Sequence, residues 1–109
     1  MNRPILVAAA LVFAIPALAA DNPGDPNTGK TLVYTCAGCH GITGWNNAYP
    51  DYHVPKIGGQ NYKYIVDALN AYKKGDRSHP TMRAQGDALS ETEIQDIAAY
   101  LSSLSPTSK

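Results

Sequence analysis

One pentapeptide constrains this chain more than any other feature: Cys36, Ala37, Gly38, Cys39 and His40 form a C-x-x-C-H run. Two thiols at this spacing can each add to a vinyl group of a haem and form thioethers, and the histidine that follows is placed to coordinate the iron. The pentapeptide therefore predicts a covalently attached haem c, bound through Cys36 and Cys39, with His40 as an iron ligand.

A C-x-x-C pair also occurs in redox-active, zinc-binding and disulfide sites. A structural zinc site needs four nitrogen or sulfur ligands, whereas the chain has only two cysteines and its other histidines, His53 and His79, stand singly. A redox pair of the thioredoxin kind lies where a strand enters a helix, and no strand-like run rich in valine or isoleucine precedes Cys36. Haem attachment is favoured over all three alternatives.

The start of the chain has the composition of a secretory signal peptide. One early cation, Arg3, precedes an apolar stretch over residues 5–18, and Ala17-Leu18-Ala19 matches the A-x-A cleavage pattern. We predict that residues 1–19 are a cleaved signal peptide and that residues 20–109 form one domain, exported to the periplasm. A membrane anchor is disfavoured because a spanning helix needs about 20 apolar residues and the stretch over residues 5–18 is shorter. We expect no membrane span in the mature form.

The predicted mature domain has about 90 residues, a size at which an apolar core alone gives marginal stability. An attached haem would supply the missing apolar interior. The whole chain carries nine basic and nine acidic residues, and this balance points to no nucleic-acid or membrane partner. Basic residues gather in residues 56–83 and acidic ones in residues 87–96. This asymmetry either steers an acidic partner or reflects ordinary solvated helix faces.

Apolar periodicity and end signals predict an all-α fold with three principal helices. A short helix over residues 27–35 leads into Cys36. Residues 61–74 carry apolar side chains at steps of three and four, and Gly75 follows as a C′ glycine. Ser90-Glu91-Thr92-Glu93 is a capping box that opens a last helix, whose apolar stripe ends before Pro106.

Two long loops, residues 41–59 and 76–89, are predicted between these helices. A structureless stretch of this length is unusual in a small domain unless it wraps something functional. A bound haem would be that group, so the loops are expected to wrap around it.

The second axial position of the iron decides its chemistry, because iron with two protein ligands mostly passes electrons whereas five-coordinate iron binds small molecules. Met82 is favoured for this position. It is the only methionine left after removal of the signal peptide, and it lies in a polar segment rather than on an apolar stripe. His79 and His53 are competing ligands, and either would give bis-histidine iron with a lower potential.

The chain resembles a class I c-type cytochrome, of the small bacterial kind whose domains also occur paired in two-haem cytochromes. The resemblance runs through Gly29, Cys36-Ala37-Gly38-Cys39-His40-Gly41, Pro55-Lys56-Ile57-Gly58-Gly59-Gln60, Tyr64, Leu69, Tyr72, Gly75, Arg77, Met82, Leu89-Ser90 and Ala98-Ala99-Tyr100-Leu101. It implies the cytochrome c fold around one covalent haem c, with Met82 as the sixth iron ligand. It also implies that the first and last helices cross, with Gly29 at the close approach and Tyr100 packed there.

The resemblance further implies that the Pro55 carbonyl accepts the ring N–H of His40 and so orients that ligand. Ile57 is expected to pack on the ring. Four other side chains are candidates for hydrogen bonds to the haem propionates or for cover of the haem edge: Trp45, Tyr49, Tyr52 and Arg77.

The motif, the export signal and the resemblance together predict a periplasmic one-electron carrier that is not an enzyme, with its iron alternating between Fe(II) and Fe(III) under His40 and Met82. Its partners would be redox proteins such as a periplasmic dehydrogenase, reductase or terminal oxidase. One alternative is a cytochrome subunit of a periplasmic dehydrogenase or oxidase complex. Another is a haem sensor or peroxidase whose sixth ligand leaves easily. Both a monomer and a subunit of a complex fit the sequence.

Overall fold

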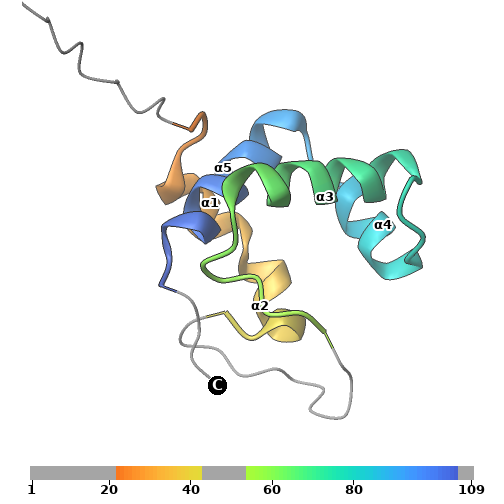
Figure 1. Ribbon diagram of the computed structural model, residues 1–109, viewed down its shortest axis with the longest axis horizontal. Helices are drawn as coiled ribbons and strands as arrows, with labels where there is room; N and C mark the ends of the chain where they lie inside the picture. Colours follow the sequence, from red (N-terminus) through yellow and green to blue (C-terminus); the bar gives the residue numbers. More distant parts are fainter. Residues whose placement is uncertain (1–21, 43–53, 106–109) are drawn as a thin grey trace, which may run out of the picture.

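The computed structural model describes residues 22–42 and 54–105 of the 109-residue chain, and every regular element among them is an α-helix. The helices are α1 (Pro26–Leu32), α2 (Tyr34–His40), α3 (Tyr62–Lys74), α4 (Pro80–Asp87) and α5 (Glu91–Ser103), as Figure 1 shows. The expected all-α class is confirmed. The predicted signal peptide, Trp45, Tyr49, Tyr52 and His53 lie outside the described residues.

Across residues 22–42 and 54–105, none of the helices combines the length and the apolar character needed to traverse a bilayer.

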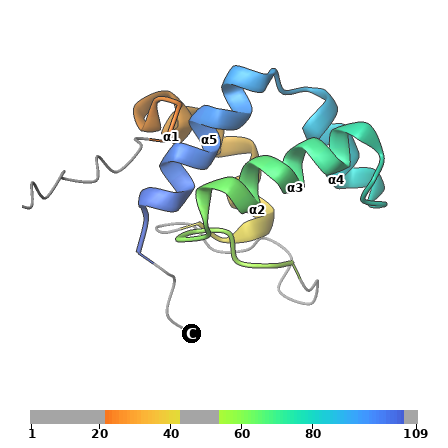
Figure 2. The same cartoon turned by 45° about the horizontal axis from the view of Figure 1, so that its top comes forward.

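Helices α1 and α5 cross at one end of the molecule (Figures 1 and 2). Gly29 permits this crossing, because a Cβ atom at this position would lie 2.0 Å from the Asp96 carbonyl oxygen and 2.9 Å from the Tyr100 Cβ. Asp96 is buried, and its carboxylate accepts a hydrogen bond of 2.7 Å from the Asp25 backbone N–H. The close approach expected at Gly29 and Tyr100 is therefore confirmed.

Helices α3 and α5 begin where the sequence signals predict. The Asn61 side chain caps α3 by accepting a hydrogen bond from the Tyr64 N–H at 3.1 Å, and Gly75 ends the helix with a φ of 87°. In the capping box of α5, the Ser90 hydroxyl accepts from the Glu93 N–H at 3.2 Å, and the Glu93 carboxylate accepts from the Ser90 N–H at 2.8 Å. Both helix starts are thus fixed by hydrogen bonds between residues three apart.

Two expectations about local structure are wrong. The segment expected as a loop over residues 76–89 contains α4, so Met82 lies on a helix. Pro80 opens that helix at its first position, where the missing N–H would have no intrahelical partner in any case. The single helix expected over residues 27–35 is instead α1 followed by α2, with Val33 between them, and α2 carries the whole C-x-x-C-H run.

The buried core is small and comes from α2, α3 and α5, together with two residues that flank α2. Its members are Val33, Ala37, Ile42, Ile65, Ile94, Ile97, Ala98 and Leu101. Helix α3 packs on α5 with its N-terminal half and on α4 with its C-terminal half (Figure 2). Other apolar side chains, among them Ile57, Leu69 and Leu89, are only partly buried and line a cavity beside this core.

Candidate functional site

A pocket of about 640 Å³ lies among α2, α3, α4 and α5. Its volume falls in the range of protein cofactor sites. It is lined by all six residues that were predicted to bind or ligate the cofactor: Cys36, Cys39, His40, Pro55, Ile57 and Met82. Much of the remaining wall is apolar and comes from Val54, Ile65, Ala68, Leu69, Leu89, Ile97 and Leu101, with polar and aromatic residues between them. Residues distant in the sequence thus meet around one space that apolar side chains surround.

The α2 wall presents two thiols. A spacing of three residues places Cys36 and Cys39 on the same face of α2, and both are free thiols. Burial raises the pKa of the Cys36 thiol, so it is uncharged at neutral pH. Two adjacent, partly buried thiols at an apolar cavity suit covalent attachment of an apolar group that carries two vinyl substituents.

His40 is the last residue of α2, and Gly41 ends the helix in the left-handed region with a φ of 59°. The Nδ1 atom of His40 lies 2.7 Å from the Pro55 carbonyl oxygen. A carbonyl oxygen only accepts hydrogen bonds, so Nδ1 carries the proton and the neutral ring keeps a lone pair on Nε2. His40 is therefore oriented by Pro55 and chemically ready to bind a metal through Nε2.

His79 has the opposite hydrogen bonding. It is the N-cap of α4, and its Nδ1 atom accepts a hydrogen bond of 3.2 Å from the Met82 backbone N–H. An amide N–H only donates, so the proton of neutral His79 lies on Nε2, and neither ring nitrogen has a lone pair available for iron. This geometry disfavours His79 in its competition with Met82 for the second axial position.

Met82 lies in the first turn of α4 and lines the pocket. The buried Gly86, one turn later, lets α4 pack closely on α3: a Cβ atom there would lie 3.1 Å from the Leu69 carbonyl oxygen and 3.2 Å from the Lys73 nitrogen. The Lys73 ammonium also donates a hydrogen bond to the Leu89 carbonyl, beyond the end of α4. The position of Met82 is thus set by the contacts between α4 and α3.

An aromatic and cationic cluster lines the pocket near Met82. The Arg77 guanidinium lies 4.6 Å from the centroid of the Tyr72 ring, and the His79 ring meets Tyr72 edge-on with a centroid distance of 6.3 Å. All three residues line the pocket. Arg77, one of the four candidates for propionate contacts, therefore brings a positive charge to the cavity.

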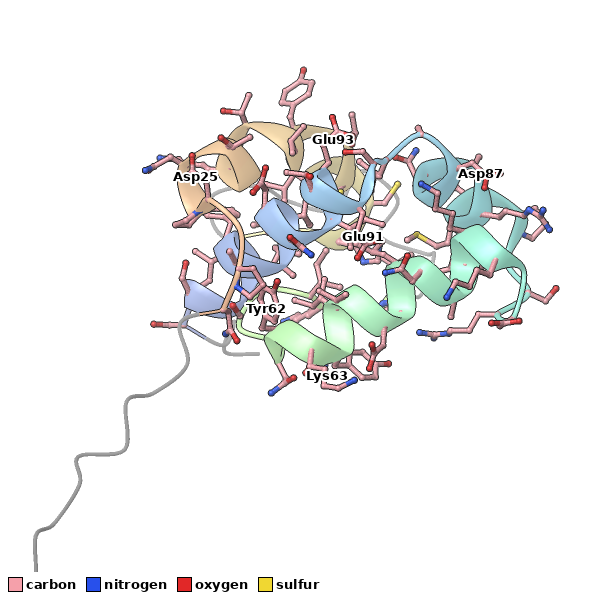
Figure 3. The ribbon with its side chains drawn as sticks, turned by 90° about the horizontal axis from the view of Figure 1, so that it is seen from above. Asp25, Tyr62, Lys63, Asp87, Glu91 and Glu93 are labelled. Atoms are coloured by element: carbon pink, nitrogen blue, oxygen red, sulfur yellow. The ribbon has the colours of Figure 1, made fainter. Side chains whose placement is uncertain are left out.

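Charged side chains outside the pocket partly neutralise each other. Lys63 pairs with Asp67 at 2.6 Å, and Arg83 pairs with Asp87 at 3.7 Å, both along one helix face and both exposed. Figure 3 shows Asp87 on α4 and Glu91 and Glu93 at the start of α5, with Lys63 on the outer side of α3. The charge asymmetry of the sequence is thus reduced by local pairs, each of which contributes little to stability.

The sequence reasoning missed several polar residues of the pocket: Thr35, Gln60, Thr81 and Gln85. Helical spacing could have found one of them, because Gln85 follows Met82 by three residues and lies on the same face once this segment is known to be helical. Within the described ranges, no group of three or more histidine, cysteine, aspartate or glutamate side chains is placed to hold a metal ion by itself.

Known proteins resemble the chain over most of its length. The family model for cytochrome c matches residues 27–105. The chain is 34% identical to cytochrome c4 of Stutzerimonas stutzeri, over 94% of this chain and 51% of that protein. It is also 34% identical to the cytochrome subunit of sulfide dehydrogenase of Chlorobaculum tepidum, over 94% of this chain and 92% of that protein.

A solved structure also matches. The crystal structure of reduced recombinant cytochrome c4 from Pseudomonas stutzeri aligns with a TM-score of 0.59 and 25% identity, over 77% of this chain and 52% of that chain. The present chain therefore spans about half the length of the cytochromes c4 that it matches.

Proposed function

Since the chain belongs to the cytochrome c family, we propose that it is a periplasmic one-electron carrier with one covalently attached haem c. The helical structure and its likeness to cytochrome c4 confirm the expected cytochrome c fold. The observation that carries the functional proposal is the pocket, which gathers two free thiols, an imidazole with an available Nε2 and a thioether sulfur. Export follows from the proposed cleavage of residues 1–19.

Cys36 and Cys39 would anchor the cofactor by adding their S–H groups across its two vinyl groups, the sulfur bonding to one vinyl carbon and the hydrogen to the other. His40 would bind the iron through Nε2, while its Nδ1–H donates to the Pro55 carbonyl. Met82 would supply the second axial ligand from α4. Bound haem provides an iron that accepts and returns one electron.

The residues around the pocket favour the reduced state of that iron. Apolar walls penalise the extra positive charge of the ferric form, and thioether ligation acts in the same direction. Pro55 and Ile57 also line the pocket, and the Pro55 carbonyl lies against the His40 ring. We therefore propose a positive reduction potential, and a value well below zero would contradict Met82 as the ligand.

Because His40 and Met82 would occupy both axial positions, no place is left on the iron for a substrate. This is the basis for proposing a carrier rather than an enzyme, sensor or peroxidase. Carbon monoxide should bind the reduced protein only slightly at neutral pH. Strong binding would favour the alternatives with a labile sixth ligand.

A second candidate function is a cytochrome subunit in a periplasmic dehydrogenase or oxidase complex. It is favoured by the match to the Chlorobaculum tepidum protein, a cytochrome subunit of sulfide dehydrogenase, because the match covers nearly the whole of both chains. Both candidates imply redox proteins as partners. Native purification separates them, since a free monomer supports the carrier and a stable hetero-complex supports the subunit.

One spectroscopic experiment tests the proposed site directly. A reduced-minus-oxidised absorption spectrum of the purified protein should show haem c, and the ferric form should show the weak sulfur-to-iron band of methionine ligation. Extraction under denaturing conditions should leave the haem on the chain. A protein without haem, or a haem without the sulfur-to-iron band, would overturn the proposal in its cofactor or in its ligand.

A further inference from the structure

We infer that His79 is a positioning residue for Met82: its imidazole caps α4 through the backbone N–H of Met82 itself and thereby holds the sulfur at the iron. The inference rests on the proposed function, because it concerns the same site. It also gives His79 a role different from the ligand role for which the sequence made it a candidate.

The capping bond acts on the ligand residue itself. The first N–H groups of a helix have no intrahelical partner, and in α4 the first of them is absent because Pro80 has none. The Met82 N–H, which is partly buried, donates to Nδ1 of His79 at 3.2 Å. The His79 carbonyl in turn accepts from the Arg83 N–H at 2.8 Å. His79 therefore ties the first turn of α4 together at Met82.

The capping imidazole is itself held in place. Its ring packs edge-on against Tyr72 of α3 with a centroid distance of 6.3 Å, and the Arg77 guanidinium covers the Tyr72 ring at 4.6 Å. The following Pro80 favours the extended backbone that His79 adopts, with φ of −161° and ψ of 106°. His79 is thus a link from α3 to the Met82 backbone as well as a helix cap.

Met82 depends more than His40 on non-covalent contacts to stay at the iron. Helix α4 has eight residues, too few to be stable without caps and packing. His40 directly follows Cys39, which the covalent attachment would fix, whereas Met82 has no covalently attached neighbour. Loss of the cap should therefore free the sulfur before it disturbs the rest of the protein.

The test compares His79→Ala with His79→Asn in the haem-loaded protein. Asparagine is among the preferred N-cap residues and keeps a side-chain acceptor, whereas alanine has none. In each ferric variant, the sulfur-to-iron band and the helical circular dichroism are followed on heating. For His79→Ala, we expect about a fivefold larger population without the iron–sulfur bond, equivalent to about 1 kcal/mol. The band should then disappear at a lower temperature than the helices, and His79→Asn should restore most of the difference.

Asn61→Ala is the matched control. Asn61 caps α3 through a bond of 3.1 Å to the Tyr64 N–H, the same kind of cap on a helix that carries no proposed ligand. This variant should unfold earlier, with the band and the helices lost together. If His79→Ala behaves in the same way, or if its band is as stable as in the unsubstituted protein, the inference is wrong. A missing band in the unsubstituted protein would instead refute Met82 ligation and with it the proposed site.

Discussion

The α2 and α4 sides of the pocket place their proposed iron ligands by different means. On α2, His40 follows two cysteines that can bond covalently to the cofactor, and its ring is fixed by the Pro55 carbonyl. On α4, Met82 depends on non-covalent contacts, namely the His79 cap and the close packing of Gly86 on α3. This difference predicts that the proposed bond from His40 to the iron is retained when the protein is perturbed, and that the proposed bond from Met82 breaks first.

The largest effect is expected when the two cysteines of α2 are removed. Cys36→Ala combined with Cys39→Ala should abolish stable haem capture and with it the fold, because the remaining buried core is small. Haem retention after denaturing electrophoresis and helical circular dichroism measure the two losses. Thr31→Ala, a change at an exposed residue of α1 that does not line the pocket, should leave both unchanged. A folded, haem-bearing double variant would show that covalent attachment on α2 is not what fixes the haem.

Removal of the α4 ligand should be less drastic. Met82→Ala should keep the haem and the fold but eliminate the sulfur-to-iron band, open the iron to carbon monoxide and lower the potential. The fall should be a sizeable part of the roughly 0.8 V range that axial ligands span. Voltammetry and absorption spectroscopy measure these changes. Gln85→Ala alters the same pocket-facing side of α4 and should retain the band, and retention of the band by Met82→Ala would exclude Met82 as ligand.

Substitution of one glycine on each side tests how closely α4 and α2 are packed. Gly86→Ala would bring a Cβ atom within 3.1 Å of the Leu69 carbonyl oxygen, so it should displace α4 and destabilise the protein by about 1–3 kcal/mol. Gly38→Ala on α2 meets nothing within 4 Å and should be neutral or stabilise by up to about 1 kcal/mol. Denaturant unfolding measures both changes. Equal destabilisation by both substitutions would remove the proposed contrast.

The smallest effect is expected at a site that belongs to neither side. Tyr62 lies at the start of α3 (Figure 3), and its hydroxyl is buried without a hydrogen-bond partner among the described residues. Tyr62→Phe should therefore leave stability at neutral pH nearly unchanged or slightly raised, with no change in the haem spectrum. A drop of more than about 1 kcal/mol would reveal a hydrogen bond from the hydroxyl that the described residues do not contain.

Tyr62 also predicts a pH dependence. Burial, with the negative charges of Glu91 and Asp96, raises the pKa of Tyr62 above its ordinary value of 10.0. The folded state therefore keeps this proton more strongly than the unfolded state. The resulting contribution of Tyr62 to the free energy of unfolding is fully present below pH 10 and is lost as the pH rises toward the higher folded-state pKa. Unfolding measured at alkaline pH should show a shallower decline for Tyr62→Phe. Identical pH profiles would contradict the shift.

Local signals explain which parts of the fold the sequence revealed. The start of α5 depends on a cap within three residues, so the Ser90–Glu93 box could be predicted directly, and α3 was predicted from its apolar period and from Gly75 at its end. Helix α4 was missed because its cap is a histidine, which is not among the usual N-cap residues, and because its packing partner is a separate helix. Its short length and sparse apolar residues gave no periodic pattern.

In the candidate site too, local features could be predicted from the sequence and contacts between distant residues could not. The C-x-x-C-H run is local in sequence, and its residues were identified from that run alone. The His40–Pro55 contact joins residues 15 positions apart, and only the resemblance to a family suggested it. The bond between His79 and Met82 is local, but it depends on the helical geometry of a segment that read as a loop. The C-x-x-C-H spacing therefore identified His40, and the methionine count identified Met82, as candidate ligands. The tautomers of the histidines and the contacts that support each ligand required coordinates.

The crossing at Gly29 has a consequence for the order of assembly. The hydrogen bond from Asp25 to Asp96 connects residues 71 positions apart, and the buried face of α5 supplies much of the core that α1 covers. Such a pairing cannot form until α5 has been synthesised. A nascent chain can present its cysteines early, but α1 can pack only after the ribosome has made α5, 71 residues beyond Asp25.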